Sequence, residues 1–167
     1  MEELVGQYDI VINCTGVEAS KLVDDPKIKP IRGQVFRVYA PWIKHCVMAG
    51  DHYIIPNTDN VVLGGTKGYD DWNLVVDPRD SVNIMDNCCQ LIPSLRSAQI
   101  LNEWVGLRPG RQEVRLEKEV IGNYGNKLHV IHNYGHGGSG VTLSWGCAQE
   151  VQQIVNQIIA KNLNSKL

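Results

Sequence analysis

The chain has 167 residues, with 16 Lys or Arg against 18 Asp or Glu, so its formal net charge is −2. Hydrophobic residues make up 43% and charged residues 20%, which is typical of a soluble domain with a packed core and argues against disorder. The balanced charge, without basic blocks, predicts neither a nucleic-acid partner nor an anionic membrane surface. The acidic start Met1-Glu-Glu-Leu4 is unlike a signal peptide, and no apolar run is long enough to span a bilayer.

The cysteine pattern does not indicate a disulfide framework. The five cysteines are an odd number without C-x-x-C spacing, and two of them are the neighbours Cys88 and Cys89. This pattern predicts reduced, mostly buried thiols in an intracellular protein. A catalytic cysteine is the alternative interpretation.

The N-terminal third predicts strands. An apolar run over Tyr8–Gly16, bounded by a glycine, is typical of a buried strand in an α/β sheet. Gln34–Ala40 alternates polar and apolar residues, as a half-buried antiparallel strand does. His52–Pro56 and Asn60–Gly64 flank a short polar turn, which predicts a hairpin.

Two helices are predicted further along. The first begins at Pro78 and continues through Leu91, ahead of Pro93, with its apolar face at Val82, Met85, Cys89 and Ile92. The second and longest covers 141–161 and places Val151, Ile154, Val155, Ile158 and Ile159 on one face.

Strands over Gln99–Gly106 and Leu128–Asn133 complete the predicted elements. The middle of the chain therefore predicts an antiparallel sheet, and the two ends predict α/β structure. The expected fold class is mixed α/β (α+β). One face of the middle sheet is expected to cover a ligand.

A glycine loop precedes the long helix. Gly135-His-Gly-Gly-Ser-Gly140 matches G-x-G-x-x-G, but a Rossmann fingerprint needs an acidic residue about 20 positions later. Ala160 and Lys161 stand there instead. We therefore expect a backbone surface that faces an anionic or electron-rich ring, since glycines permit close approach and helix N-termini favour negative charge. A plain tight turn is the alternative.

Three histidines near this loop do not predict a metal site. His129 and His132 point to opposite faces of a strand, so they cannot chelate one ion together with His136. We expect satisfied or solvated histidines and no bound metal.

Three arginines, Arg108, Arg111 and Arg115, lie within eight residues. Arg108 follows an apolar segment, and a guanidinium that enters a buried site requires an anion there. A bidentate arginine is the natural partner of a substrate carboxylate, and Tyr53 is a candidate second donor. Surface charges are the alternative.

Six motifs in the same order resemble the D-amino-acid oxidase family over nearly the whole chain. They are Val11-Ile-Asn-Cys-Thr-Gly16, Arg32-Gly-Gln-Val35, Tyr53-Ile-Ile-Pro56, Leu63-Gly-Gly-Thr66, Gly106-Leu-Arg-Pro109 and Ile131-His-Asn-Tyr-Gly-His-Gly-Gly138. Asp71-Trp-Asn-Leu74, after Gly65-Thr-Lys67, is more similar to the D-aspartate oxidase branch than to the branch for neutral D-amino acids.

The resemblance implies FAD as cofactor and two domains. Residues 1–32 and 106–167 would belong to a Rossmann-type FAD-binding domain, and residues 33–105 to a substrate-binding domain with an antiparallel sheet. The family's N-terminal half, which carries the G-x-G-x-x-G turn for the FAD pyrophosphate, has no counterpart here. We therefore expect the C-terminal half of such an enzyme, as a fragment, a short isoform or an incomplete gene model.

The same resemblance assigns site residues. Arg108 would pair with the substrate α-carboxylate, Tyr53 would hydrogen-bond it, and the Gly138 backbone would contact the substrate amino group. The residues that would line the flavin are Thr15, Gly137, Gly138, Ser139, Gly140, Val141 and Thr142. Lys67 would meet a side-chain carboxylate, although the aspartate branch usually has Arg there. A solvent-exposed lysine beside Asp70 and Asp71 is the alternative.

The implied reaction is oxidative deamination of D-aspartate by oxygen, giving a 2-oxo acid, ammonia and hydrogen peroxide. Two alternatives remain: oxidation of neutral D-amino acids, or a half-chain that acts as a binding or interaction module. The C-terminal tripeptide Ser165-Lys166-Leu167 matches the address read by the peroxisomal import receptor, so we expect a peroxisomal matrix protein.

Overall fold

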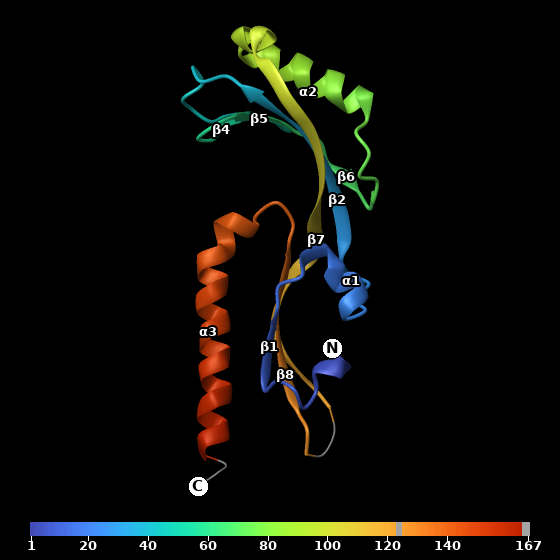
Figure 1. Cartoon of the computed structure of the whole chain (residues 1–167), viewed down its shortest axis with the longest axis vertical. Coiled ribbons are helices and arrows are strands. Elements are labelled where there is room, and N and C mark those ends of the chain that lie inside the picture. Colours follow the sequence, from blue (N-terminus) through green and yellow to red (C-terminus); the bar gives the residue numbers. More distant parts are fainter. Residues whose placement is uncertain (123–124, 165–167) are drawn as a thin grey trace. The chain divides into compact units, whose positions relative to one another are not determined.

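The computed structural model describes residues 1–122 and 125–164, with side chains up to residue 161 (Figure 1). In these residues eight strands pair in the order β1-β8-β7-β2-β5-β4-β3, and β6 pairs with β2. The chain divides into two compact units: unit 1 contains Met1–Lys29 and Arg108–Leu167, and unit 2 contains Pro30–Leu107. The boundaries lie within three residues of the expected domain boundaries, and the role of each unit stays a prediction.

Unit 1 combines parallel and antiparallel strand pairs with one long helix. Its main elements are β1 (Ile10–Asn13), the C-terminal part of β7 (Gln99–Ile121), β8 (Leu128–His136) and α3 (Gly140–Asn164), with the short helices η1 (Glu2–Leu4), η2 (Gly16–Glu18) and α1 (Ala19–Leu22). β1 runs parallel to β8, and β7 runs antiparallel to it. The helix α3 lies alongside these strands, and Val151 and Ile158 pack on Ile131 (Figure 1).

Unit 2 is an antiparallel sheet with a helix against it. Its strands are β2 (Lys29–Tyr39), β3 (Val47–Ala49), β4 (His52–Pro56), β5 (Val61–Gly64), β6 (Gly68–Tyr69) and the start of β7. Its helices, α2 (Pro78–Leu91) and η3 (Pro93–Ser97), lie between β6 and β7 in the chain. β5 pairs with both β2 and β4. The buried core joins Ile54 and Leu63 of the sheet to Ile84 and Cys88 of α2.

The helix α2 has the predicted bounds, and most of its predicted apolar face is packed: Cys89 is in the core, and Met85 and Ile92 pack against it. Asp77 caps the helix by accepting a 2.9 Å hydrogen bond from the Arg79 N–H, and Pro78 occupies the first turn. Val82, expected on the apolar face, is 61% exposed, whereas Ile84 and Cys88 are buried. The buried face is therefore shifted from the predicted one: it adds Ile84 and Cys88 and leaves out Val82.

Three other expectations need correction. The strand β1 is only partly buried: Ile12 is 49% exposed and Asn13 is buried, and among the described residues β1 is the end strand of the sheet. Residues 32–36 of β2 are all buried, since the segment 73–81 hydrogen-bonds to Arg32 and Gln34. Of the five free cysteines, only Cys88 and Cys89 are buried.

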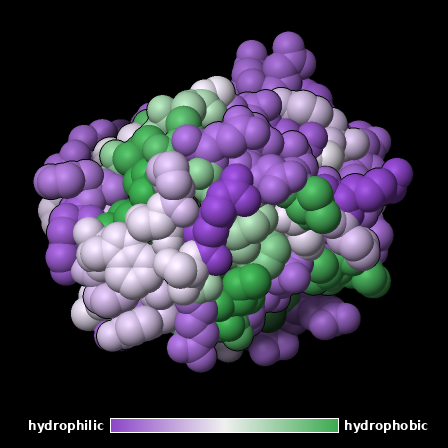
Figure 2. All heavy atoms as spheres, turned by 90° about the horizontal axis from the view of Figure 1, so that it is seen from above, coloured by the Kyte–Doolittle hydropathy of each residue, from purple (hydrophilic) through white to green (hydrophobic). Residues whose placement is uncertain are grey.

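Apolar side chains also reach the surface. On the face drawn in Figure 2 they form separate groups between polar side chains. In α3, Val141 and Trp145 are 91% and 78% exposed. Within residues 1–122 and 125–164, no helix has the length and apolar character needed to cross a membrane.

Candidate functional site

In unit 2, the predicted substrate residue Tyr53 lies across a pair of glycines. Tyr53 of β4 is the partner of Gly64 in β5. A Cβ on Gly64 would overlap the Tyr53 ring, and a Cβ on Gly65 would come within 2.6 Å of the ring Cε1. The Gly-Gly pair of the Leu63–Thr66 motif is therefore required for the position of the Tyr53 ring, because any larger residue would displace it.

Lys67 follows this glycine pair and forms an ion pair with Asp51. Its Nζ lies 2.5 Å from the Asp51 Oδ1, and both side chains are more than half exposed. The structure thus gives Lys67 a carboxylate partner other than Asp70 or Asp71, the neighbours named in the alternative interpretation. Its role toward a substrate stays a prediction.

A cavity of about 240 Å³ lies next to Lys67. It is lined by Arg32, Thr66, Lys67, Gly68, Asp71, Asn73, Asp77 and Asp80. Arg32 is buried and donates to the Asp80 carboxylate at 2.7 Å and to the Val75 carbonyl at 2.7 Å. No role was predicted for Arg32, although it begins the Arg32–Val35 motif.

In unit 1, Arg108 lies beside the glycine loop. A Cβ on Gly138 would lie 3.8 Å from the Arg108 Cδ, and the Gly137 N–H donates a 2.8 Å hydrogen bond to the Pro109 carbonyl. Gly16 approaches the same place, since a Cβ there would lie 3.9 Å from the Pro109 Cβ. The structure therefore brings the predicted carboxylate-binding arginine and the predicted cofactor loop together.

The predicted flavin-lining residues come from the carboxyl ends of two adjacent parallel strands. Thr15 follows β1, and the segment from Gly137 to Thr142 follows β8 and enters α3. Thr15 and the residues 138–142 are exposed. The first-turn N–H groups of α3 carry partial positive charge and lack helical partners, which suits an electron-rich ligand at this place.

A buried hydrogen-bond chain supports Thr15, and sequence reasoning missed it. Asn13 accepts from the Thr15 hydroxyl at 2.7 Å and from its N–H at 3.2 Å, so its amide nitrogen faces the His132 Nδ1 at 3.2 Å. The His132 Nε2 is 2.8 Å from Glu119. Because the Asn13 amide can only donate, His132 accepts at Nδ1 and donates from Nε2. Asn13 and His132 lie 119 positions apart, so no local pattern could reveal the contact.

The other two predicted arginines bind an aspartate of their own unit. Arg111 Nε lies 3.1 Å from the Asp25 Oδ2, and Arg115 donates to the Tyr134 hydroxyl at 2.8 Å. Tyr134 in turn donates to Asp25 at 2.9 Å. Burial alone would raise the pKa of the Asp25 carboxyl, but hydrogen bonds from Lys27, Tyr134 and Arg111 together lower it. Arg111 and Arg115 thus have carboxylate or hydroxyl partners within unit 1, although Arg111 also packs against Gly135 at the start of the glycine loop. Arg108 stays the candidate because of its position beside Gly138.

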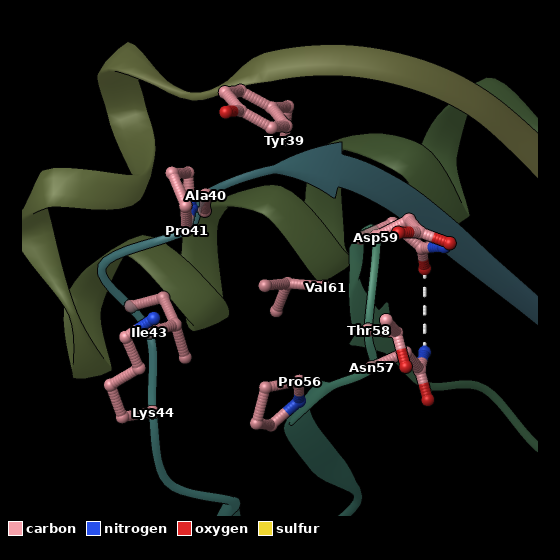
Figure 3. Close-up of a pocket in the computed structure, with 11 residues that line it drawn as sticks. Tyr39, Ala40, Pro41, Ile43, Lys44, Pro56, Asn57, Thr58, Asp59 and Val61 are labelled. Atoms are coloured by element: carbon pink, nitrogen blue, oxygen red, sulfur yellow. Dashed lines mark hydrogen bonds between the residues drawn. The ribbon is translucent and has the colours of Figure 1, made fainter.

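A larger cavity in unit 2 involves none of the predicted residues. It has a volume of about 600 Å³ and lies between the segment after β2 and the β4–β5 turn, where Asn57 donates to Asn60 (Figure 3). Its lining residues are Tyr39, Ala40, Pro41, Ile43, Lys44, Pro56, Asn57, Thr58, Asp59, Asn60 and Val61.

In the part of the chain that the structure describes, no group of three or more His, Cys, Asp or Glu side chains is placed to hold a metal.

Residues 2–154 match the family described as FAD dependent oxidoreductase. The chain belongs to this family. It is 49% identical over 162 residues to a D-amino acid oxidase of Dugesia ryukyuensis, and this alignment covers 95% of this chain and 49% of that relative. It is 45% identical over 159 residues to a D-aspartate oxidase of Homo sapiens, covering 94% of this chain and 47% of that relative.

A solved structure of glycine oxidase from Geobacillus kaustophilus shows the same fold as this member of the FAD dependent oxidoreductase family. It matches with a TM-score of 0.76 and 22% identity, over 89% of this chain and 41% of that one. The chain thus spans about half the length of the curated relatives that it matches. The predicted family and mixed α/β fold class are confirmed.

The residues of unit 1 fit the FAD that gives this family its description. Gly16 and Gly138 lie against Pro109 and Arg108, and Gly137 hydrogen-bonds to the Pro109 carbonyl, so three residues without side chains meet where a flat ring could approach the backbone closely. Thr15 and the segment from Gly137 to Thr142 would line such a ring. Their assignment to individual flavin atoms stays a prediction.

Proposed function

We propose that this chain carries half of an FAD-dependent oxidase of D-amino acids, with D-aspartate and related acidic D-amino acids as preferred substrates. The relatives named D-amino acid oxidase and D-aspartate oxidase support the reaction class. The structural observation that carries the proposal is the contact between Arg108 and the glycine loop at Gly138. This contact supports the proposal because Arg108, the proposed partner of the substrate carboxylate, lies next to the backbone that would face the flavin.

Each residue has a role that follows from its chemistry. The Arg108 guanidinium would bind the substrate α-carboxylate through two parallel hydrogen bonds, which fixes the orientation of Cα. The Gly138 backbone would contact the substrate amino group, and the Tyr53 hydroxyl is proposed as a further donor to the carboxylate. FAD, when bound, supplies the hydride acceptor and the reaction with oxygen that yields hydrogen peroxide.

The acidic preference is assigned to Lys67. A side-chain carboxylate buried without a cation would be strongly unfavourable, so a cation must face it. Lys67→Met keeps the length of the side chain and removes its charge. We expect activity on D-aspartate to fall at least about tenfold while activity on D-alanine persists, with Lys44→Met, an exposed lysine of the same unit, as control. Equal loss of both activities would contradict this role.

One observation favours neutral D-amino acids as the second candidate. Lys67 already pairs with the Asp51 carboxylate, so a neutral substrate side chain would leave that ion pair undisturbed. Comparing kcat/KM for D-aspartate and D-alanine decides between the two substrate classes.

The first experiment measures flavin uptake. The purified chain is incubated with FAD and desalted, and we expect the flavin absorbance bands to remain with the protein. The loaded protein is then assayed for peroxide formation with D-aspartate. A chain that retains no flavin would support the remaining alternative, a half-chain that serves as a binding module.

We also propose that the chain is addressed to the peroxisomal matrix. The proposal rests on Ser165-Lys166-Leu167, which lies outside the described residues. Confinement to this organelle would suit a reaction that releases hydrogen peroxide.

A further inference from the structure

The ion pair between Asp51 and Lys67 joins two short segments of unit 2. Asp51 lies in the turn between β3 and β4, directly after Gly50, whose positive φ of 59° is a conformation that glycine adopts readily. Lys67 comes three residues after the end of β5. The hydrogen bond from the Lys67 Nζ to the Asp51 Oδ1 is 2.5 Å long.

This ion pair lies at the same end of the β4–β5 hairpin as Tyr53. Tyr53 is two positions after Asp51, and its partner Gly64 is three positions before Lys67. The proposed substrate donor thus lies in β4, and the proposed side-chain cation lies in the segment that follows the neighbouring strand β5. The carboxylate of Asp51 has the same chemistry as the side-chain carboxylate of an acidic substrate.

We propose that Asp51 is a specificity-determining residue: its carboxylate occupies the Lys67 ammonium and competes there with the side-chain carboxylate of an acidic D-amino acid. This inference rests on the proposed function. A neutral substrate leaves the Asp51–Lys67 pair closed, whereas an acidic substrate must replace Asp51 at Lys67. No covalent bond changes in this exchange of one carboxylate for another.

The exposure of the pair makes the exchange feasible. The Lys67 and Asp51 side chains are 53% and 64% exposed, so water can solvate the displaced carboxylate. Ion pairs of this kind contribute little net stability because solvent and salt screen them. Asp51 therefore adjusts the preference between acidic and neutral substrates by a small factor, without preventing acidic substrates from binding.

The test compares Asp51→Asn with the wild-type chain in a binding measurement that needs no turnover. Succinate, a dicarboxylate without an amino group, is titrated while the side-chain NMR signal of Lys67 is followed, with Lys67→Met used to assign that signal. We expect the apparent Kd to fall about two- to fivefold in Asp51→Asn, the range that an exposed competing pair allows. The control is Asp86→Asn, which removes an equal charge from an exposed position of α2 and should leave the Kd unchanged.

A second readout uses the flavin-loaded protein. The ratio of kcat/KM for D-aspartate to that for D-alanine should rise about two- to fivefold in Asp51→Asn and stay constant in Asp86→Asn. An unchanged Kd in Asp51→Asn, or equal shifts in both variants, would overturn the role of Asp51. Absence of oxidation with any D-amino acid would overturn the proposed function, and a shift in the succinate Kd would then still support competition at Lys67.

Discussion

At the scale of single residues, the three clustered arginines differ in their partners. Arg111 lies against Asp25, and Arg115 binds Tyr134 beside the same carboxylate, whereas the Arg108 stem runs beside Gly138. A charge-assisted bidentate pair is worth about 1.5–3 kcal/mol, and a misoriented substrate loses more. Arg108→Ala is therefore expected to reduce kcat/KM for D-aspartate about a hundredfold or more in the flavin-loaded protein.

Two further variants make the Arg108 measurement specific. Arg108→Lys keeps the charge but not the planar fork, so its activity should fall between those of wild type and Arg108→Ala. Arg96→Ala removes an exposed arginine of unit 2 and should retain wild-type kinetics. Unchanged kinetics in flavin-loaded Arg108→Ala would contradict the assigned role.

The cysteines offer a residue-scale test of the core of unit 2. Burial raises the pKa of the Cys88 thiol to about 11, so at pH 8 this thiol is protonated and also shielded from reagents. Peptide mapping after brief alkylation of the native protein should find Cys46 labelled and Cys88 with Cys89 unlabelled. Labelling of all three cysteines at equal rates in the absence of denaturant would show that the α2 face is not packed as described.

The contacts of a residue were predictable where the residue belongs to a recognisable motif. They were not predictable where a partner distant in the sequence determines them. The position of Arg108 beside Gly138 follows from two glycine-containing motifs. The Asp51–Lys67 pair was not predicted, because it depends on how the β3–β4 turn brings Asp51 to a lysine 16 positions away. The hydrogen bond between His132 and Asn13 was not predicted either, because the residues around His132 in the sequence do not indicate this partner.

At the scale of elements, β7 and β8 are joined to the N-terminal segment by the Tyr134 hydroxyl. Tyr134 is 1% exposed and links Arg115 of β7 to Asp25. Tyr134→Phe leaves both partners with one hydrogen bond fewer, and we expect a loss of about 1–3 kcal/mol in the free energy of unfolding, measured by urea denaturation. Tyr39→Phe, at an exposed tyrosine, should change stability little.

The effect of Tyr134→Phe should depend on pH. The folded-state pKa of Asp25 lies below the ordinary value of 3.8, so its stabilising contribution is present above pH 3.8 and is lost as the pH falls through the folded pKa. Without the Tyr134 hydroxyl the folded pKa moves back toward 3.8. The difference in unfolding free energy between wild type and variant should therefore narrow below about pH 3.8, and a difference that widens there would contradict this explanation.

The elements themselves were largely predictable from local signals. Asp77 and Pro78 mark the start of α2, and Pro93 follows soon after its end. The buried side of α2 was predicted at Cys89, Met85 and Ile92 but not at its edges, since the position of the sheet decides that Ile84 is covered and Val82 is exposed. The burial of Arg32 and Gln34 was equally hidden, since a loop more than 40 positions away supplies their partners.

At the scale of the whole molecule, the localisation proposal can be tested apart from any activity. A fluorescent reporter fused upstream of residues 156–167 should give a punctate pattern that coincides with a peroxisomal marker, because the receptor reads a free C-terminal tripeptide. The same fusion without Leu167 should be diffuse. Diffuse fluorescence from both fusions would remove the localisation proposal.

The division into two units also sets an order for folding. Unit 2 is a single continuous segment, Pro30–Leu107, whereas unit 1 needs both Met1–Lys29 and the segment that starts at Arg108. The parallel pairing of Asn13 with His132 closes a loop of more than a hundred residues, and the entropy lost in closing so long a loop slows its formation. During synthesis the hydrophobic core around Ile54 and Leu63 can close while β8 is still inside the ribosome. β1 cannot pair before β8 has been synthesised more than a hundred positions later, so the strand pair that positions Thr15 and the glycine loop is expected to form after the core of unit 2.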